Sequence, residues 1–447
     1  MTRMTSTALS ALLLTSLVPL NGAADEQSLH AIGTAPSAQR IQTDIATLVN
    51  FGTRHTLSET DSDTRGIGAA RRWIKAEFDA IAAACGGCLE VFYVSDIVSG
   101  TNRIPNPVEV VNVIAVQRGT RDTNRYVMMT ADIDNRISDP MNFTDNSPGA
   151  NDNASGMAGV LETARVLTQY AFPGSIIYAG LSGEEQGLNG GEIFARWALE
   201  RDWDLQVVIN NDMIGNIRGI TGVVDNTTAR VFSEGTRYDE TPEEAAQRRS
   251  QGGEVDSASR NVARYIDHMA DLYVPNLDVM MVYRLDRFGR GGHHRPFNEA
   301  GIPAVRIMET NENYHWQHND VRVEDGIAYG DVIEHVDFDY AAKLTALNAV
   351  TLAAMAWAPA PPKEVSISGQ VSPDTTLRWA KVPGATSYRV HWRLTTEPQW
   401  TYSRTVGDVD EFTLENVVID NYYFGVSSLS ESGVQSPVVF PGPAGAF

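Results

Sequence analysis

The chain has 447 residues, which is too long for one ordinary hydrophobic core, so two domains are expected. Its 56 acidic and 35 basic residues give a net charge of -21. This charge argues against binding to nucleic acid or anionic lipid, because both attract basic surfaces. Hydrophobic residues make up 43% of the chain and aromatic residues 8%, which excludes a wholly disordered protein.

The N-terminus has the pattern of a secretory signal peptide. Arg3 provides a positive charge, residues 8–20 are apolar, and small residues at 22–24 precede Asp25. The apolar run is shorter than a membrane-spanning helix needs. We therefore predict a signal peptide at residues 1–24 and a mature protein that is secreted or periplasmic, without a membrane span.

Helical and strand-like patterns alternate over the next 300 residues. Apolar residues at three- and four-residue spacing predict helices at 41–49 and 66–84. Strand-like runs follow, with helical patterns between them, at 108–116, 126–130, 175–181, 205–209 and 304–307. This alternation predicts an α/β fold with a mostly parallel sheet that helices cover on both faces. A long alanine-rich helix at about 340–357 ends the region.

The two cysteines, Cys85 and Cys88, follow the second predicted helix. An exported protein favours a local disulfide between them. A thioredoxin-like redox pair would instead stand at the start of a helix after a strand. A zinc knuckle would need two more ligands, and the neighbouring sequence supplies none.

The last part of the chain changes character after a proline-rich linker at 358–362. Residues 363–447 contain short alternating strands separated by turns, which predicts an all-β, immunoglobulin-like sandwich. The positions of Trp379 and Tyr388 resemble those in a fibronectin type III domain. We therefore predict a larger domain at 25–357 and a C-terminal module that binds an extracellular ligand or serves as a spacer.

Four polar clusters follow predicted strands or begin a predicted helix. In a parallel sheet the carboxyl ends of the strands meet at one edge, so these clusters are expected to converge. Gathered carboxylates are costly unless a cation neutralises them, and a pair of metal ions does so. Helix capping and polar strand ends are the alternative interpretations of single clusters. The clusters are Asp132-Ile133-Asp134, Asn151-Asp152-Asn153, Glu184-Glu185 and Asn211-Asp212.

Three motifs in series resemble those of the co-catalytic zinc peptidases of the bacterial leucyl aminopeptidase type. They are Gly-Ala-Asn-Asp-Asn-Ala-Ser-Gly at 149–156, Gly-Glu-Glu-Gln-Gly-Leu at 183–188 and Asn-Asp-Met-Ile-Gly at 211–215. The resemblance spans roughly residues 40–357. It implies a three-layer α/β sandwich of the phosphorylase/hydrolase type and two zinc ions per chain.

The same resemblance implies a role for each motif residue. Asp152 would bridge the two zinc ions, Glu185 would bind one of them, and Asp212 would bind the other. Glu184 would be the general base that takes a proton from the attacking water.

The chain departs from the family at its two ligand histidines. Where the family has His-x-Asp, this chain has Asp132-Ile133-Asp134, so Asp132 replaces a zinc ligand. Aspartate is a harder ligand than histidine, so this site would be weaker, empty or filled by another divalent metal. Asp134 matches the aspartate that orients the missing histidine. The second family histidine matches His318, with His315 as the alternative.

Further residues are expected to line a substrate pocket. His293 and His294 stand where the family has Asp-His before x-Pro-Phe, so His293 replaces an acidic residue. Tyr314 is near enough in sequence to His318 to polarise the substrate carbonyl.

The resemblance implies an exported metal-dependent aminopeptidase that cleaves N-terminal residues from peptides or proteins. Three other hypotheses about its function stay open, because the same fold serves different activities. The chain could be a single-zinc glutaminyl cyclase, a carboxypeptidase or deacylase, or a non-catalytic binding protein with a degenerate site.

Overall fold

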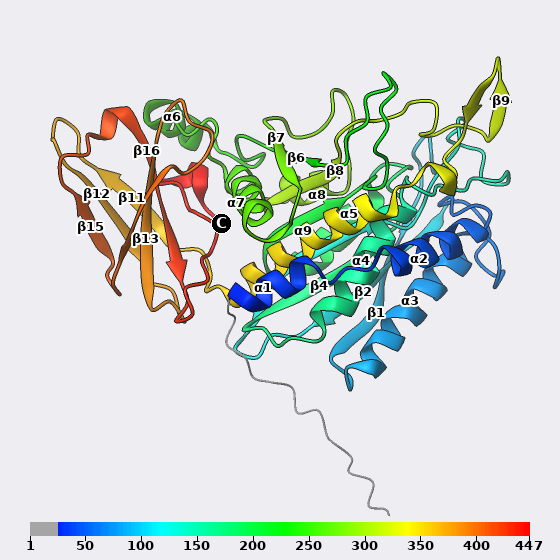
Figure 1. Ribbon diagram of the computed structural model, residues 1–447, viewed down its shortest axis with the longest axis horizontal. Helices are drawn as coiled ribbons and strands as arrows, with labels where there is room; N and C mark the ends of the chain where they lie inside the picture. The colour runs from blue at the N-terminus through cyan, green and yellow to red at the C-terminus, as the bar shows by residue number, and fades with distance from the viewer. Residues whose placement is uncertain (1–25) are drawn as a thin grey trace, which may run out of the picture.

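The computed structural model describes residues 26–447, so the predicted signal peptide lies outside the described residues. Figure 1 shows a large α/β unit and, at one end of it, a smaller unit of β-strands formed by the C-terminal part of the chain. Between residues 26 and 447, no helix is both long enough and apolar enough to cross a membrane.

An eight-stranded mixed sheet forms the centre of the large unit, in the order β1-β2-β4-β3-β5-β8-β6-β7. The four strands β4, β3, β5 and β8 are mutually parallel, whereas β1, β2 and β6 add antiparallel pairings at the two sides. The predicted α/β fold class is thus confirmed. The strands are β1 (Leu89–Val98), β2 (Val108–Gln117), β3 (Asp122–Asp132), β4 (Gly174–Leu181), β5 (Asp204–Asn211), β6 (Thr228–Ser233), β7 (Asp278–Val282) and β8 (Ala304–Glu309).

Helices cover both faces of this sheet because the central strands are apolar on both sides. Along β3, Val127 and Met129 belong to one hydrophobic core, while Tyr126 and Met128 belong to the other. Two helices pack against the second core, α5 (Asn189–Leu199) and α8 (His294–Glu299). The first core is covered by α1 (Glu26–Gly33), α2 (Ala38–Asn50), α3 (Gly66–Ala84), α4 (Ala154–Leu167), α7 (Ala258–Tyr273) and α9 (Phe338–Trp357).

The parallel strands end level with one another. Asp132 at the end of β3 pairs with Leu181 of β4, and the preceding Ala131 pairs with Asn211 of β5. Asn211 in turn pairs with Ile307 of β8. The residues that follow these strands therefore emerge at a common edge, as the alternation of strands and helices predicts.

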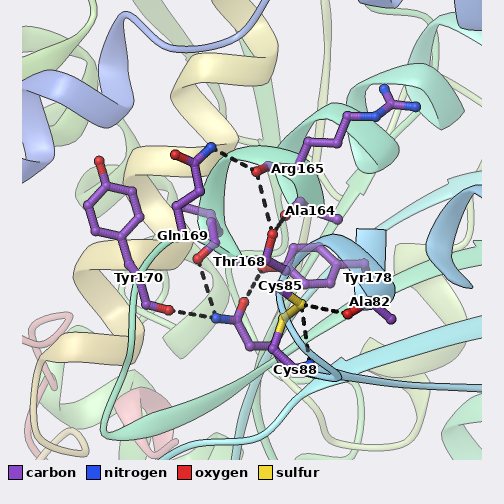
Figure 2. The surroundings of a disulfide bond; sticks show 11 residues. Ala82, Cys85, Cys88, Ala164, Arg165, Thr168, Gln169, Tyr170 and Tyr178 are labelled. Atoms are coloured by element: carbon purple, nitrogen blue, oxygen red, sulfur yellow. Dashed lines mark hydrogen bonds between the residues drawn. A yellow bond between two sulfur atoms is a disulfide. The ribbon is translucent and has the colours of Figure 1, made fainter. Parts of the chain in front are cut away.

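The two cysteines form a disulfide at the end of α3, which confirms the favoured interpretation of this pair. Gly86 and Gly87 between them have φ angles of 74° and 89°, a left-handed conformation that side chains disfavour. The Cys85 sulfur also accepts a hydrogen bond from the backbone N–H of Cys88 at 3.2 Å. Figure 2 shows this turn near the segment that follows α4.

The C-terminal unit consists of two three-stranded antiparallel sheets. The aromatic rings of Trp379 and Tyr388, on opposite sheets, lie 5.3 Å apart in the core between them. Helix α9 ends at Trp357, and the first strand of this unit begins at Lys363. The fibronectin type III assignment stays a prediction. One sheet has the order β11 (Lys363–Ser368), β12 (Thr375–Ala380), β15 (Glu411–Leu414), and the other β14 (Tyr402–Val406), β13 (Ser387–Leu394), β16 (Tyr422–Leu429).

A buried charged cluster joins the two units. The carboxylate of Asp256, which precedes α7, accepts hydrogen bonds of 2.9 Å from Arg393 of β13 and from Arg264 of α7. All three side chains are at most 1% exposed. Beside them, the hydroxyl of Tyr265 donates to the backbone oxygen of Gln435 at 2.8 Å. Buried charges require specific partners, so this cluster fixes the orientation of the C-terminal unit.

Candidate metal centre

The acidic motif residues come together at the edge where the parallel strands end. Asp132 ends β3, Glu184 and Glu185 follow β4, and Asp212 follows β5. Asp152 lies just before α4, whose N-terminus is capped by Asn153 through a hydrogen bond from the N–H of Gly156. The structure therefore brings into one region side chains that are up to 80 positions apart in the sequence.

Three of these side chains form a group that can hold a metal ion. Asp152, Glu185 and His318 each offer one ligand atom, and the three atoms lie within 4.8 Å of one another. The Nε2 of His318 lies 2.8 Å from Oδ2 of Asp152 and 2.8 Å from Oε1 of Glu185. Two carboxylates and an imidazole are ligands that zinc takes in proteins. These residues therefore fit a metal ion.

Two residues that the sequence analysis did not single out hold these ligands in place. Arg136 contacts both Glu185, at 2.8 Å from Oε2, and His318, at 2.6 Å from Nδ1. The carboxylate of Asp331 accepts hydrogen bonds from the backbone N–H groups of Asn151 at 2.9 Å and Asp152 at 2.7 Å. Arg136 stands two positions after Asp134, which is the only sequence signal for it. Asp331 lies in no motif.

The charges of the three residues depend on one another. Burial alone would lower the pKa of His318, but the carboxylates of Glu185 and Asp152 outweigh it and raise this pKa to about 9. Against the effect of burial, the charge of His318 in turn lowers the pKa of Asp152 and of Glu185. The three side chains thus form one electrostatically coupled group, which Arg136 also contacts.

Asp134 organises the loop that carries the two glutamates. Its carboxylate accepts hydrogen bonds of 3.2 Å from the backbone N–H groups of both Glu184 and Glu185. It also accepts one of 2.9 Å from the hydroxyl of Thr56. Asp134 therefore orients the glutamate loop, a role that differs from orienting a histidine.

Glu184 lies beside this group without belonging to it. Its side chain is partly exposed, and burial together with the neighbouring Glu185 raises its pKa well above the usual range. A carboxyl group with a raised pKa holds a proton more readily than a free carboxyl group, as a general acid must.

Asp132 already has partners of its own. Its Oδ1 lies 2.6 Å from Nδ1 of His293, and its Oδ2 accepts a hydrogen bond of 2.7 Å from the side chain of Asn153. Burial lowers the pKa of His293 to about 4, so this imidazole is neutral at pH 7. The replacement of the family histidine by Asp132 and of the family acid by His293 thus produces a contact between the two residues.

Asp212 is paired with an arginine. Its Oδ2 lies 2.7 Å from Nη2 of Arg306, a residue of β8 that is fully buried. Asp286 contacts the same guanidinium at 3.0 Å. Against the effect of burial, these two carboxylates raise the pKa of Arg306 above its usual range, so it stays charged. In the sequence, the sign of this pair is Arg306 itself, a charged residue within the otherwise apolar run at 304–308.

The residues proposed for a second metal ion therefore do not fit one. Asp132 and Asp212 lie outside the ligand group that contains Asp152, as judged over residues 26–447. Each of the two has a protein partner within 2.7 Å.

Other candidate residues lie elsewhere around the site. His315 lies outside the ligand group, and its ring lies 4.9 Å from that of Tyr329. Tyr314 is 59% exposed. His294 is buried, with Nε2 2.9 Å from the backbone oxygen of Leu285. Of the two candidate histidines, it is His318 that faces the carboxylates.

Two curated relatives match almost the whole chain. A protein of Leptosphaeria maculans named probable zinc metalloprotease is 42% identical over 423 residues, which cover 94% of this chain and 98% of that protein. One of the same name in Pyricularia oryzae is 40% identical over 92% of this chain and 84% of its own length.

Solved structures share the fold. The LapA aminopeptidase of Legionella pneumophila matches with a TM-score of 0.53 at 19% identity, over 77% of this chain and 78% of that one. LapB of the same organism matches with a TM-score of 0.51 at 18% identity, over 75% and 76%. The model of peptidase family M28 matches residues 112–336, the segment that contains every candidate ligand. Together with the two fungal relatives, this match shows that the chain belongs to peptidase family M28.

Proposed function

We propose that this protein is an exported zinc-dependent aminopeptidase. The observation that carries the proposal is the group of Asp152, Glu185 and His318, which places three zinc-type ligands together with Glu184 next to them. The fungal relatives are named probable zinc metalloproteases, and LapA is titled an aminopeptidase. Peptides or proteins with a free N-terminus are the proposed substrates.

In the proposed reaction, Asp152, Glu185 and His318 would hold the zinc ion. The ion supplies Lewis-acid chemistry, since it polarises a carbonyl group and lowers the pKa of water. Glu184 takes the proton of the attacking water and passes it to the leaving amine. Asp134 positions Glu184 through its backbone N–H, and Arg136 holds Glu185 and His318.

The balance of charge favours an amino group over a carboxylate as the end of the substrate that enters. Six acidic side chains meet at this edge, and among the contacts described above two guanidinium groups, those of Arg136 and Arg306, pair with them. A substrate ammonium would therefore be attracted to this acidic edge, whereas a substrate carboxylate would be repelled. The six are Asp132, Asp134, Asp152, Glu184, Glu185 and Asp212.

A small cavity of about 10 Å³, about the space of one water molecule, lies beside Asp152. Its lining includes Met213, Trp316 and His335, together with the acidic residues Glu309 and Asp331.

The experiment compares one chromogenic leucine amide with a free amino group and the same compound with an acetylated amino group. We expect zinc-dependent hydrolysis of the free amine only. Equal release of the chromophore from both would indicate an endopeptidase, and release of acetate alone would indicate a deacylase. Cleavage of an N-blocked peptide from its C-terminus would indicate a carboxypeptidase. Cyclisation of an N-terminal glutamine without hydrolysis would indicate a glutaminyl cyclase. The absence of any turnover with zinc bound would support the binding-protein reading.

Export has its own test. We expect mass spectrometry of the protein recovered from the medium or periplasm to show a mature N-terminus at Asp25. A retained Met1 would contradict the proposed signal peptide.

A further inference from the structure

The site contains a positively charged side chain, that of Arg306, beside Asp212. Nη2 of Arg306 lies 2.7 Å from Oδ2 of Asp212, and both side chains are at most 5% exposed. The family resemblance assigns Asp212 to a second metal ion, yet a protein side chain stands within contact distance of its carboxylate.

Arg306 is held there from several sides. Its Nη1 lies 3.0 Å from Oδ2 of Asp286 and donates to the backbone oxygen of Gly291 at 2.7 Å. A Cβ atom added at Gly292 would lie 3.1 Å from the same Nη1, so the chain packs tightly against it. Arg306 also lies in β8, an interior strand of the eight-stranded sheet between β5 and β6. The guanidinium is therefore held beside Asp212 by an ion pair, a hydrogen bond and close packing.

The other two carboxylates that would share a second metal ion are also engaged. Asp132 contacts His293 at 2.6 Å and Asn153 at 2.7 Å. The Oδ2 of Asp152 lies 2.8 Å from His318, within the first metal group. A second divalent ion would have to displace both Arg306 and His293, and the displaced guanidinium would lose its buried contact with Asp212.

We propose that this protein binds a single metal ion, and that the guanidinium of Arg306 permanently takes the place of a second metal ion beside Asp212. The inference rests on the proposed metallopeptidase function. Asp212 is then the partner of an arginine rather than a metal ligand. The positive charge that a second metal ion would supply is provided by the chain itself and cannot be removed by a chelator.

The direct test is the zinc content of the full-length protein. The protein is saturated with zinc chloride and dialysed, and its zinc per chain is measured by elemental analysis together with aminopeptidase activity. One zinc per chain is expected. Two zinc ions with activity would overturn the single-metal inference but leave the proposed function standing. No bound zinc and no hydrolysis would overturn both.

Two variants test the role of Arg306. Asp212→Asn removes the carboxylate partner of Arg306 and is expected to keep one zinc per chain. Loss of the zinc from this variant would show that Asp212 is a metal ligand. The double variant D132H/R306M restores the family histidine and removes the guanidinium, and it is expected to bind two zinc ions. A double variant that circular dichroism shows to be folded and that still binds one zinc contradicts the proposal. If it does not fold, the wild-type protein and D212N decide the question.

Discussion

The carboxylate of Asp134 accepts a hydrogen bond of 3.2 Å from the backbone N–H of Glu184. The same carboxylate accepts an equal bond from the next residue, Glu185. Two consecutive glutamates are therefore anchored by their backbone, which leaves their side chains free for different tasks. Glu185 contacts His318 in the metal group, while Glu184 stands beside that group.

This division of tasks predicts the effect of Glu184→Gln. Glutamine keeps the size of the side chain but cannot take a proton from water. We expect the turnover number to fall by about 10²- to 10⁴-fold, the range that general acid–base catalysis contributes. Zinc per chain should be unchanged, since Glu184 lies outside the ligand group. A variant with wild-type turnover would show that another residue is the base.

The buried cluster around Asp256 predicts that the two units stabilise each other. Arg393→Met leaves the Asp256 carboxylate with Arg264 alone in a buried site. The free energy of unfolding, measured by urea titration, should fall by about 3 kcal/mol.

The matched control is Arg378→Met, in the same C-terminal unit. Arg378 pairs with Glu411, and both side chains are at least 50% exposed. Its loss should change the free energy of unfolding by less than about 1 kcal/mol. Equal effects of the two variants would contradict a stabilising role for the buried cluster.

The raised pKa of Glu234, a residue outside the metal centre, predicts that the stability of the protein depends on pH. Burial, with a smaller contribution from Asp239, raises the pKa of Glu234 from 4.5 to about 8 in the folded protein. The folded state therefore holds this proton more tightly than the unfolded state. The stability that it contributes is full below pH 4.5 and is lost as the pH rises through about 8.

Glu234→Gln removes this titration and keeps an oxygen that can accept from Asn298, whose side-chain nitrogen lies 3.2 Å away. The melting temperature of the variant relative to wild type should therefore rise between pH 5 and pH 9. A difference that stays constant over this range would show that Glu234 does not titrate as described.

The disulfide closes a loop of only four residues, so its effect on stability should be small. The double variant C85S/C88S is expected to lower the free energy of unfolding by about 2 kcal/mol, the chain-entropy contribution for so short a loop. Peptidase activity of the folded variant should match the wild type. Lost activity would contradict a purely structural role.

The sequence predicted the common edge of the site because its physical basis is local. Each of β3, β4 and β5 is a largely apolar run with an acidic residue at its end or within three positions after it, and parallel strands end at the same edge. The positions of Asp132, Glu185 and Asp212 follow from that pattern. The series of three motifs then supplied their expected roles.

The partners of these residues could not be predicted in the same way. Arg306 and Asp286 are 20 positions apart and meet only because the loop before α8 returns to β8. Asp331 reaches Asp152 from a loop that carries no motif. Such contacts depend on how the loops pack, and this packing cannot be inferred from the spacing of residues along the chain. The contact between Arg393 and Asp256, which joins the two units, also depends on packing, because the two residues are far apart in the sequence.

The most decisive comparison is between His318→Ala and His315→Ala, measured as zinc per chain and as hydrolysis of a free-amino leucine amide. The two histidines are three positions apart, but only His318 places Nε2 2.8 Å from both Asp152 and Glu185. We predict that His318→Ala loses both zinc and hydrolysis, whereas His315→Ala keeps its zinc. Zinc retained in a folded His318→Ala protein, or lost in a folded His315→Ala protein, would contradict the metal centre described here.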